Sequence, residues 1–191
     1  MRRSLDSVSG KEVVWTAKEE GWRLGDVSAD GRYAILNFGV DIFRLDLIGQ
    51  SPRVPERMFH LTQLPIAVRL SHDGRSIVYR AGTESWISAF PPNGQSPRRI
   101  SDGTRGVWPF FSSDDRTLYA LTLDRLLAHP ISREGIAGPP SMLFQYAHSD
   151  RLGANLAAAS RDGKRILAIA TEDTEQIGPQ VISDWTALLP K

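Results

Sequence analysis

Short stretches of alternating apolar and polar residues run along most of the chain, and clusters of turn-forming residues separate them. Successive side chains of a β-strand point to opposite faces of the sheet, so this alternation predicts half-buried strands. No segment combines helical periodicity with capping residues at both ends. We therefore expect an all-β protein with almost no helix.

One turn sequence is repeated along the chain. It has the form Ser-x-Asp-Gly/Asp-Arg/Lys, and an alternating apolar strand follows it in VSADGRYAIL, LSHDGRSIVY, FSSDDRTLYA and ASRDGKRILA. The serines are residues 28, 71, 112 and 160, so the spacings are 43, 41 and 48 residues. An Asp-Gly pair between apolar stretches marks a hairpin, because its residues tolerate positive φ. A period of this length is typical of one propeller blade, so the repeat predicts a β-propeller of about four four-stranded blades.

Each period contains further short alternating stretches after the hairpin. Third strands are expected at 41–47, 84–90 and 124–131, and fourth strands at 57–62, 97–101 and 141–146. We expect a single domain over residues 1–191, with blades near 22–62, 65–101, 107–146 and 153–189, and with residues 1–17 as the outer strands of a shared or preceding blade.

The sequence leaves the closure of the ring open. The chain starts in mid-blade, because the segment that ends in EVVWTA (12–17) has the pattern of a third and a fourth strand. If EVVWTA pairs with the last blade, strand sharing closes a ring of about four blades and leaves no exposed edge. Alternatively, the blades belong to a partial or open ring of about six to eight, completed by a longer chain or a second copy. The mid-blade start favours this alternative slightly, and self-association is then expected.

The hairpin carries a family resemblance. Together with the later stretches RRIS and FHLT, it resembles the WD40-like propeller repeat of the TolB family, whose blades have a Ser-Pro-Asp-Gly turn. The closing segment GPQVISDWTALLPK is also similar to the end of TolB-like propellers at the C-terminus of larger bacterial proteins. The chain departs from the pattern in two ways. Asp115 replaces Gly in the third copy, where positive φ strains a residue with a side chain, and the usual Pro is replaced by Ala29, His72, Ser113 and Arg161.

The repeated turn residues have a structural explanation. The Asp carboxylate can accept hydrogen bonds from nearby backbone N–H groups, Gly supplies the positive φ, and the Ser hydroxyl can cap the inner strand. Repetition in every blade places these carboxylates far apart around the ring, not together in one catalytic or metal site. We therefore assign a turn-forming role to Asp30, Gly31, Asp73, Gly74, Asp114, Asp115, Asp162 and Gly163.

Catalytic and metal-binding motifs are missing from the sequence. It has no cysteine, and its four histidines, at 60, 72, 129 and 148, have no spacing that would bring two imidazoles to one metal ion. Each histidine is expected on the surface or on a strand face. There is no nucleophile elbow, phosphate loop or kinase signature. We therefore expect no metal, no cofactor and no enzymatic activity.

Candidate binding residues come from the expected loop positions. Loops that join the outer strand of one blade to the inner strand of the next gather at one mouth of a propeller, where binding sites usually lie. Trp22 and Trp108 both enter an inner strand just after such a loop. The candidate residues on this rim are Gln63, Arg105, Trp108, His148 and Arg151.

Charge and hydropathy exclude other classes of partner. Lys and Arg number 23 against 22 Asp and Glu, and a net charge of +1 is not that of a nucleic-acid-binding protein. No stretch approaches the roughly 20 apolar residues of a membrane span, and the N-terminus lacks the apolar core of a signal peptide. We expect a soluble protein, cytoplasmic as the sequence stands and periplasmic if it is part of a longer exported or membrane-anchored protein.

These observations predict a non-catalytic β-propeller that presents loops to a protein or peptide partner, as a binding or scaffold module of a larger bacterial protein. Two alternatives stay open. The TolB resemblance implies a periplasmic component of an envelope complex. A resemblance to the propellers of the prolyl oligopeptidase family would imply a gate over a hydrolase domain that this sequence lacks.

Overall fold

The computed structural model of the protein describes residues 15–48, 53–100, 107–122, 124–132, 137–145, 157–159, 165–168 and 180–183. Every regular element within these ranges is a β-strand, which confirms the expected all-β class. Residues 1–14 and the expected turn residues Asp162 and Gly163 lie outside the described ranges. None of the described residues belongs to a helix that could span a membrane.

The strands form antiparallel sheets in chain order, one sheet for each repeat period. The first sheet contains β1 (Arg23–Val27), β2 (Tyr33–Phe38), β3 (Asp41–Asp46) and β4 (Glu56–His60). The second contains β5 (Pro65–Leu70), β6 (Ser76–Ala81), β7 (Glu84–Ala89) and β8 (Arg98–Arg99), and the third β9 (Trp108–Phe111), β10 (Thr117–Leu121), β11 (Arg125–Pro130) and β12 (Ser141–Gln145). The fourth contains β13 (Ala157–Ala159), β14 (Arg165–Ala168) and β15 (Gln180–Ser183).

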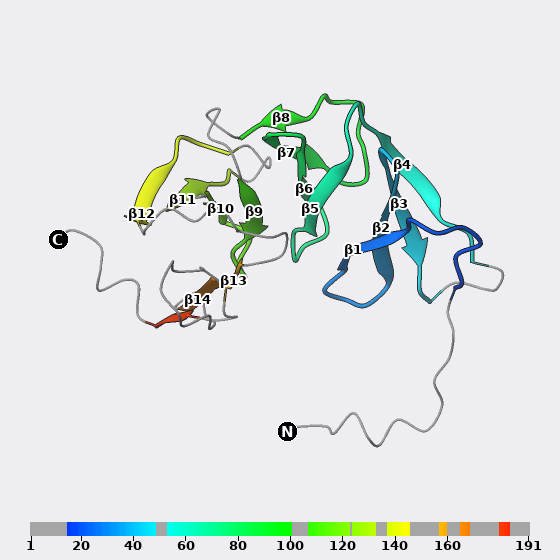
Figure 1. Ribbon diagram of the computed structural model, residues 1–191, viewed down its shortest axis with the longest axis horizontal. Helices are drawn as coiled ribbons and strands as arrows, with labels where there is room; N and C mark the ends of the chain where they lie inside the picture. Colours follow the sequence, from blue (N-terminus) through cyan, green and yellow to red (C-terminus); the bar gives the residue numbers. More distant parts are fainter. Residues whose placement is uncertain are drawn as a thin grey trace, which may run out of the picture.

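The sheets are arranged as propeller blades. Figure 1 shows the first three standing side by side in an arc that does not close into a ring. Each blade is a meander in which neighbouring strands are consecutive in the sequence. The expected propeller of four-stranded blades is therefore confirmed for the first three periods, with the ring open.

The hydrophobic core lies between the blades. Ile35 and Ile42 of the first sheet pack with Val68, Ile77 and Tyr79 of the second, and all of them are buried. The corresponding cluster between the second and third sheets contains Val78, Ile87, Ile100, Phe111 and Leu118. The burial of apolar surface thus holds each blade to its neighbour, which explains why the middle strands are apolar on both faces.

The three described copies of the repeated turn form the same hydrogen bonds. In the second blade the Ser71 hydroxyl donates to the Asp73 carboxylate at 2.7 Å, and this carboxylate accepts the Arg75 backbone N–H at 2.9 Å. The Ser71 oxygen in turn accepts the backbone N–H of Ser76 at 2.9 Å. Equivalent bonds join Ser28, Asp30, Arg32 and Tyr33 in the first blade and Ser112, Asp114, Arg116 and Thr117 in the third. Because each Ser is buried, its hydroxyl needs these partners.

The third turn differs at the position that is Gly in the others. Gly31, Gly74 and Asp115 have φ values of 71°, 69° and 56°, so the aspartate adopts the left-handed conformation that its residue type tolerates only at a cost. Its carboxylate reaches back to the preceding blade, where it accepts the backbone N–H groups of His72 at 2.9 Å and Asp73 at 2.8 Å. These two hydrogen bonds join the turns of adjacent blades.

The preceding blade decides whether this position has room for a side chain. A Cβ at Gly74 would lie 2.6 Å from the hydroxyl of Tyr33 in the first blade. In the second blade the residue that corresponds to Tyr33 is the much smaller Ser76, which lines one groove together with Asp115. The third turn thus has Asp115 where the second has Gly74. Correspondingly, the second blade has the small Ser76 where the first has Tyr33.

Polar contacts also join the blades elsewhere along their inner strands. The Asn37 side chain donates to the Pro65 carbonyl at 3.4 Å, and the Ser85 hydroxyl donates to the Val107 carbonyl at 3.2 Å. Both bonds are buried and link one blade to the entry of the next inner strand. Between β1 and β5, the carboxylate of Asp26 accepts the Leu70 N–H at 2.9 Å, and Arg69 donates to the Gly25 carbonyl at 2.8 Å.

Candidate functional site

Two of the expected rim residues lie in the described part of the chain. Gln63 is exposed in the loop between β4 and β5, and Trp108 is the first residue of β9. Arg105, His148 and Arg151 lie outside the described ranges. The geometry of the rim is therefore built from Gln63, Trp108 and the residues around them.

Trp108 forms the floor of this rim and is not an open stacking surface. It is only 7% exposed, and its ring packs with Phe110, Tyr119, Leu121 and Leu126. The indole N–H is buried and has no hydrogen-bond partner among the described residues. The guanidinium carbon of Arg80 lies 5.0 Å from the ring centroid, which is cation–π distance.

Arg80 is a candidate binding residue that was not among those expected from the sequence. It lies on β6, is half-buried, and donates from Nε to the Gly82 carbonyl at 2.9 Å. Burial lowers the pKa of the Arg80 guanidinium, but an arginine stays cationic in proteins at neutral pH. No carboxylate of the described residues pairs with it, and its two terminal nitrogens have no partner there. In the sequence, the feature that could have identified Arg80 is its position as a single charged residue in the largely apolar strand SIVYRA.

Gly82 lies next to both Gln63 and Arg80. Gly82 has a φ of 62°, and the side-chain amide of Gln63 occupies the space that a Cβ at Gly82 would fill. Gln63, Arg80 and Trp108 thus come from a blade-joining loop, the second blade and the third blade, and they meet around one turn. A fixed guanidinium with free N–H groups beside a primary amide can bind a carboxylate through paired hydrogen bonds.

The turn carboxylates have a different environment and do not form a site. The Ser28 hydroxyl, with the Arg32 backbone N–H, holds the pKa of Asp30 below its usual value. The Ser112 hydroxyl acts in the same way on Asp114. Each carboxylate is thus kept ionised by the turn of its own blade, and its oxygen is already used in that turn.

The described histidines lie apart from one another. His60 contacts the Asp41 carboxylate at 2.7 Å, and His72 lies 3.4 Å from Asp115. His129 is buried on β11. Over the ranges that the structure describes, no group of three or more His, Cys, Asp or Glu side chains could hold a metal ion.

Comparison with solved structures agrees with the propeller architecture. The structure of a protein assigned as TolB from Agrobacterium tumefaciens matches with a TM-score of 0.64 and 21% identity, over 90% of this chain and 61% of that protein. TolB from Acinetobacter baumannii matches with a TM-score of 0.67 and 14% identity over 85% of this chain and 41% of its own. The Cps50 (Swd1) β-propeller domain of Myceliophteria thermophila matches at 0.57 and 10% identity, over 81% of this chain and 52% of that domain's chain.

These similarities define the class of fold. The protein is a β-propeller of the TolB-like and WD40-like kind, and it spans less than two thirds of the length of the TolB structures that it matches. No protein-family model matches the sequence, and no curated protein does. Proteins named as a lactonase and a dehydrogenase share the fold as well, so the fold alone does not decide the function.

Proposed function

We propose that the chain is a β-propeller binding module that recognises a protein or peptide partner through an acidic group of that partner. The observation that carries the proposal is Arg80, a half-buried cation without a carboxylate partner among the described residues. Two N–H groups on each terminal nitrogen are available to a ligand at the rim.

The surroundings of Arg80 prepare it for this role. The Trp108 ring and the Gly82 carbonyl fix the guanidinium before a ligand arrives, so little side-chain entropy is lost on binding. Partial burial removes competing water and strengthens the ion pair that a carboxylate would form. Gln63 adds an exposed amide that can donate to the same group.

A peptide titration tests the proposal. The intact chain is titrated with a hexaglutamate peptide and, as the charge-reversed control, with hexalysine. Arg80→Gln should weaken hexaglutamate binding at least about tenfold, because hydrogen bonds to a charged group contribute about 1.5–3 kcal/mol. Arg57→Gln changes an exposed arginine of β4 by the same charge and is the matched control.

Two results would overturn the proposal: equal loss of affinity in Arg80→Gln and Arg57→Gln, or no binding of hexaglutamate to the parent. The thermal midpoints of both variants should stay near the parent value, which shows that any loss of affinity is local.

A further inference from the structure

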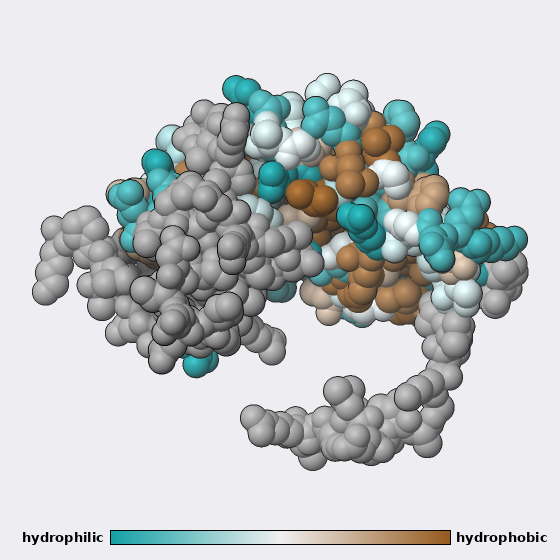
Figure 2. All heavy atoms as spheres, viewed as in Figure 1, coloured by the Kyte–Doolittle hydropathy of each residue, from teal (hydrophilic) through white to brown (hydrophobic). Residues whose placement is uncertain are grey.

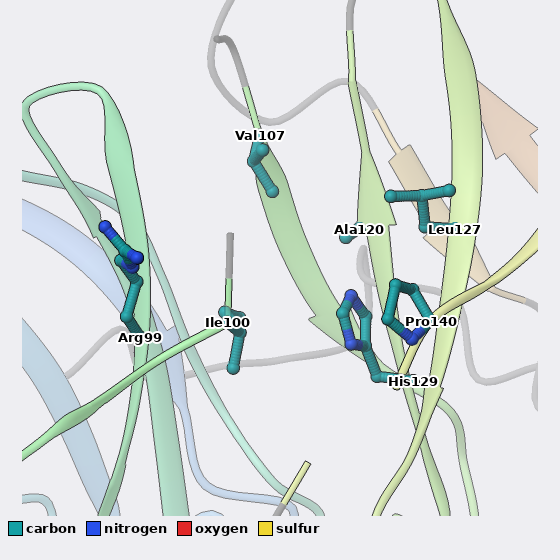
Figure 3. Close-up of a pocket in the computed structure, with 7 residues that line it drawn as sticks. All are labelled: Arg99, Ile100, Val107, Ala120, Leu127, His129 and Pro140. Carbon is teal, nitrogen blue, oxygen red and sulfur yellow. The ribbon is translucent and has the colours of Figure 1, made fainter. Parts of the chain in front are cut away.

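A pocket that shares no lining residue with the rim lies between the second and third blades. Its volume is about 190 Å³. Figure 3 shows the residues that line it, which come from the end of β8 and the residue after it, from the residue before β9, from β10 and β11, and from the segment before β12. The lining residues are Arg99, Ile100, Val107, Ala120, Leu127, His129 and Pro140.

Among the described residues that line this pocket, His129 is the polar side chain that lies deep inside it. It is 4% exposed, and in Figure 3 its imidazole projects from β11 into the space beside Ile100, Ala120 and Pro140. Its Nδ1 lies 3.1 Å from the Gly138 carbonyl oxygen. A carbonyl oxygen only accepts hydrogen bonds, so Nδ1 carries the hydrogen and donates it. In the neutral ring, Nε2 is then a hydrogen-bond acceptor.

This acceptor has no partner in the described part of the chain, and it is buried. A buried polar atom without a hydrogen bond carries a free-energy cost. The neighbouring positions on β11, Leu127 and Ala128, are apolar, and an apolar residue at 129 would avoid this cost. A ligand that donates a hydrogen bond to Nε2 would remove it.

Arg99 does not make this an anion site. It is exposed at the mouth of the pocket, where it pairs with the Glu84 carboxylate at 2.8 Å. The other described residues that line the pocket have aliphatic side chains: Ile100, Val107, Ala120, Leu127 and Pro140. A carboxylate offers only acceptors, which cannot pair with Nε2 of a neutral ring, whereas an uncharged hydroxyl group can donate to it.

From these observations we propose that the pocket binds a small uncharged molecule with an apolar ring-sized body and a single hydroxyl group, the chemistry of a phenol. The hydroxyl donates to His129 Nε2, and the ring contacts the aliphatic walls. The size is suitable, because an engineered cavity of about 150 Å³ holds benzene. This site shares no lining residue with the Arg80 rim, and the proposal does not depend on the function proposed for that rim.

Calorimetric titration of the intact chain with phenol, toluene and benzoate tests the proposal. Phenol should bind at least about tenfold more tightly than toluene, because only phenol satisfies the buried acceptor. Benzoate should bind more weakly than phenol at neutral pH. In His129→Leu the preference for phenol over toluene should vanish, whereas His60→Leu, which alters an exposed histidine, should keep it.

A second readout does not depend on the variants. The ¹⁵N resonance of His129 Nε2 in the parent should shift when phenol is added and should not shift with toluene. Equal affinities for phenol and toluene, or no binding of either up to its solubility, would overturn the proposal. If neither compound binds, then only water forms a hydrogen bond with His129 Nε2.

Discussion

The carboxylate of Asp115 accepts the backbone N–H of Asp73 at 2.8 Å, so the turn of the third blade caps the turn of the second. The same carboxylate accepts the N–H of His72, and the cost is a left-handed conformation at Asp115. At Asp115, the hydrogen bonds between blades stabilise the fold, whereas the strained backbone conformation destabilises it. Substitutions of this residue can measure the two contributions separately.

We predict that Asp115→Ala destabilises the fold by about 2–3 kcal/mol, because it loses both hydrogen bonds and keeps a side chain at positive φ. Asp115→Gly should cost about 1 kcal/mol less, since glycine relieves the strain. Urea denaturation of the parent and both variants measures these differences. Equal stabilities of the alanine and glycine variants would contradict the separation of the two effects.

The space around Gly74 gives a second prediction with an internal control. Gly31 and Gly74 have nearly the same φ, but only Gly74 has the Tyr33 hydroxyl where a Cβ would lie. Gly31→Ala should therefore cost about 1–2 kcal/mol from conformation alone, and Gly74→Ala should cost more.

A double variant isolates the contact with the hydroxyl. In a Tyr33→Phe background, the extra cost of Gly74→Ala over Gly31→Ala should shrink, because the clashing oxygen is absent. Chemical denaturation of the single and double variants measures the coupling. Additive effects of Tyr33→Phe and Gly74→Ala would show that the hydroxyl does not limit this position.

Acid should weaken the fold through the turn carboxylates. The folded-state pKa values of Asp30 and Asp114 are lowered by their serine hydroxyls, so the stabilisation is complete above the unfolded-state pKa and is lost as pH falls through the folded value. Stability should be level near pH 6 and decline below about pH 4.

Asp114→Asn keeps an acceptor oxygen and removes the titration, so its stability should fall less steeply between about pH 5 and pH 3. Glu20→Gln, at an exposed position, is the matched charge control. The readout is the urea midpoint measured across this pH range. An Asp114→Asn slope equal to that of the parent would rule out the turn as a source of acid sensitivity.

The open arc should associate with itself. Leu24 and Val27 of the inner strand β1 are 64% and 44% exposed, and Figure 2 shows apolar side chains gathered over the first and second sheets. We expect light scattering to give a mass larger than one chain, and Leu24→Lys to lower it. Met142→Lys, at a 55% exposed position on β12, should have less effect. A monomeric parent would contradict this prediction.

The turns and the strand order could be predicted from the sequence because their chemistry is local. Ser71, Asp73 and Gly74 satisfy one another within a few residues, so their spacing alone indicates the hairpin. The strain expected at Asp115 is present, but its partners belong to another blade and could not be identified from spacing.

The candidate sites were less predictable, because burial depends on how neighbouring blades pack. Trp108 was expected on the rim, but its burial by side chains of its own blade and the position of Arg80 over its ring depend on packing that the sequence does not show. His129 was expected on the surface or on a strand face. It lies on a strand, but only the placement of Gly138 determines which ring nitrogen is left without a hydrogen-bond partner.

The pairing of Tyr33 with Gly74 and of Ser76 with Asp115 limits how such a protein can evolve. Repeats of this kind arise by duplication of a gene segment, and equivalent copies could in principle be exchanged or reordered. Here a third blade placed directly after the first would bring the Asp115 side chain against the Tyr33 hydroxyl. The turns of the second and third blades are therefore each matched to a residue of the blade before them, and recombination that reorders these blades would be selected against unless both partners moved together.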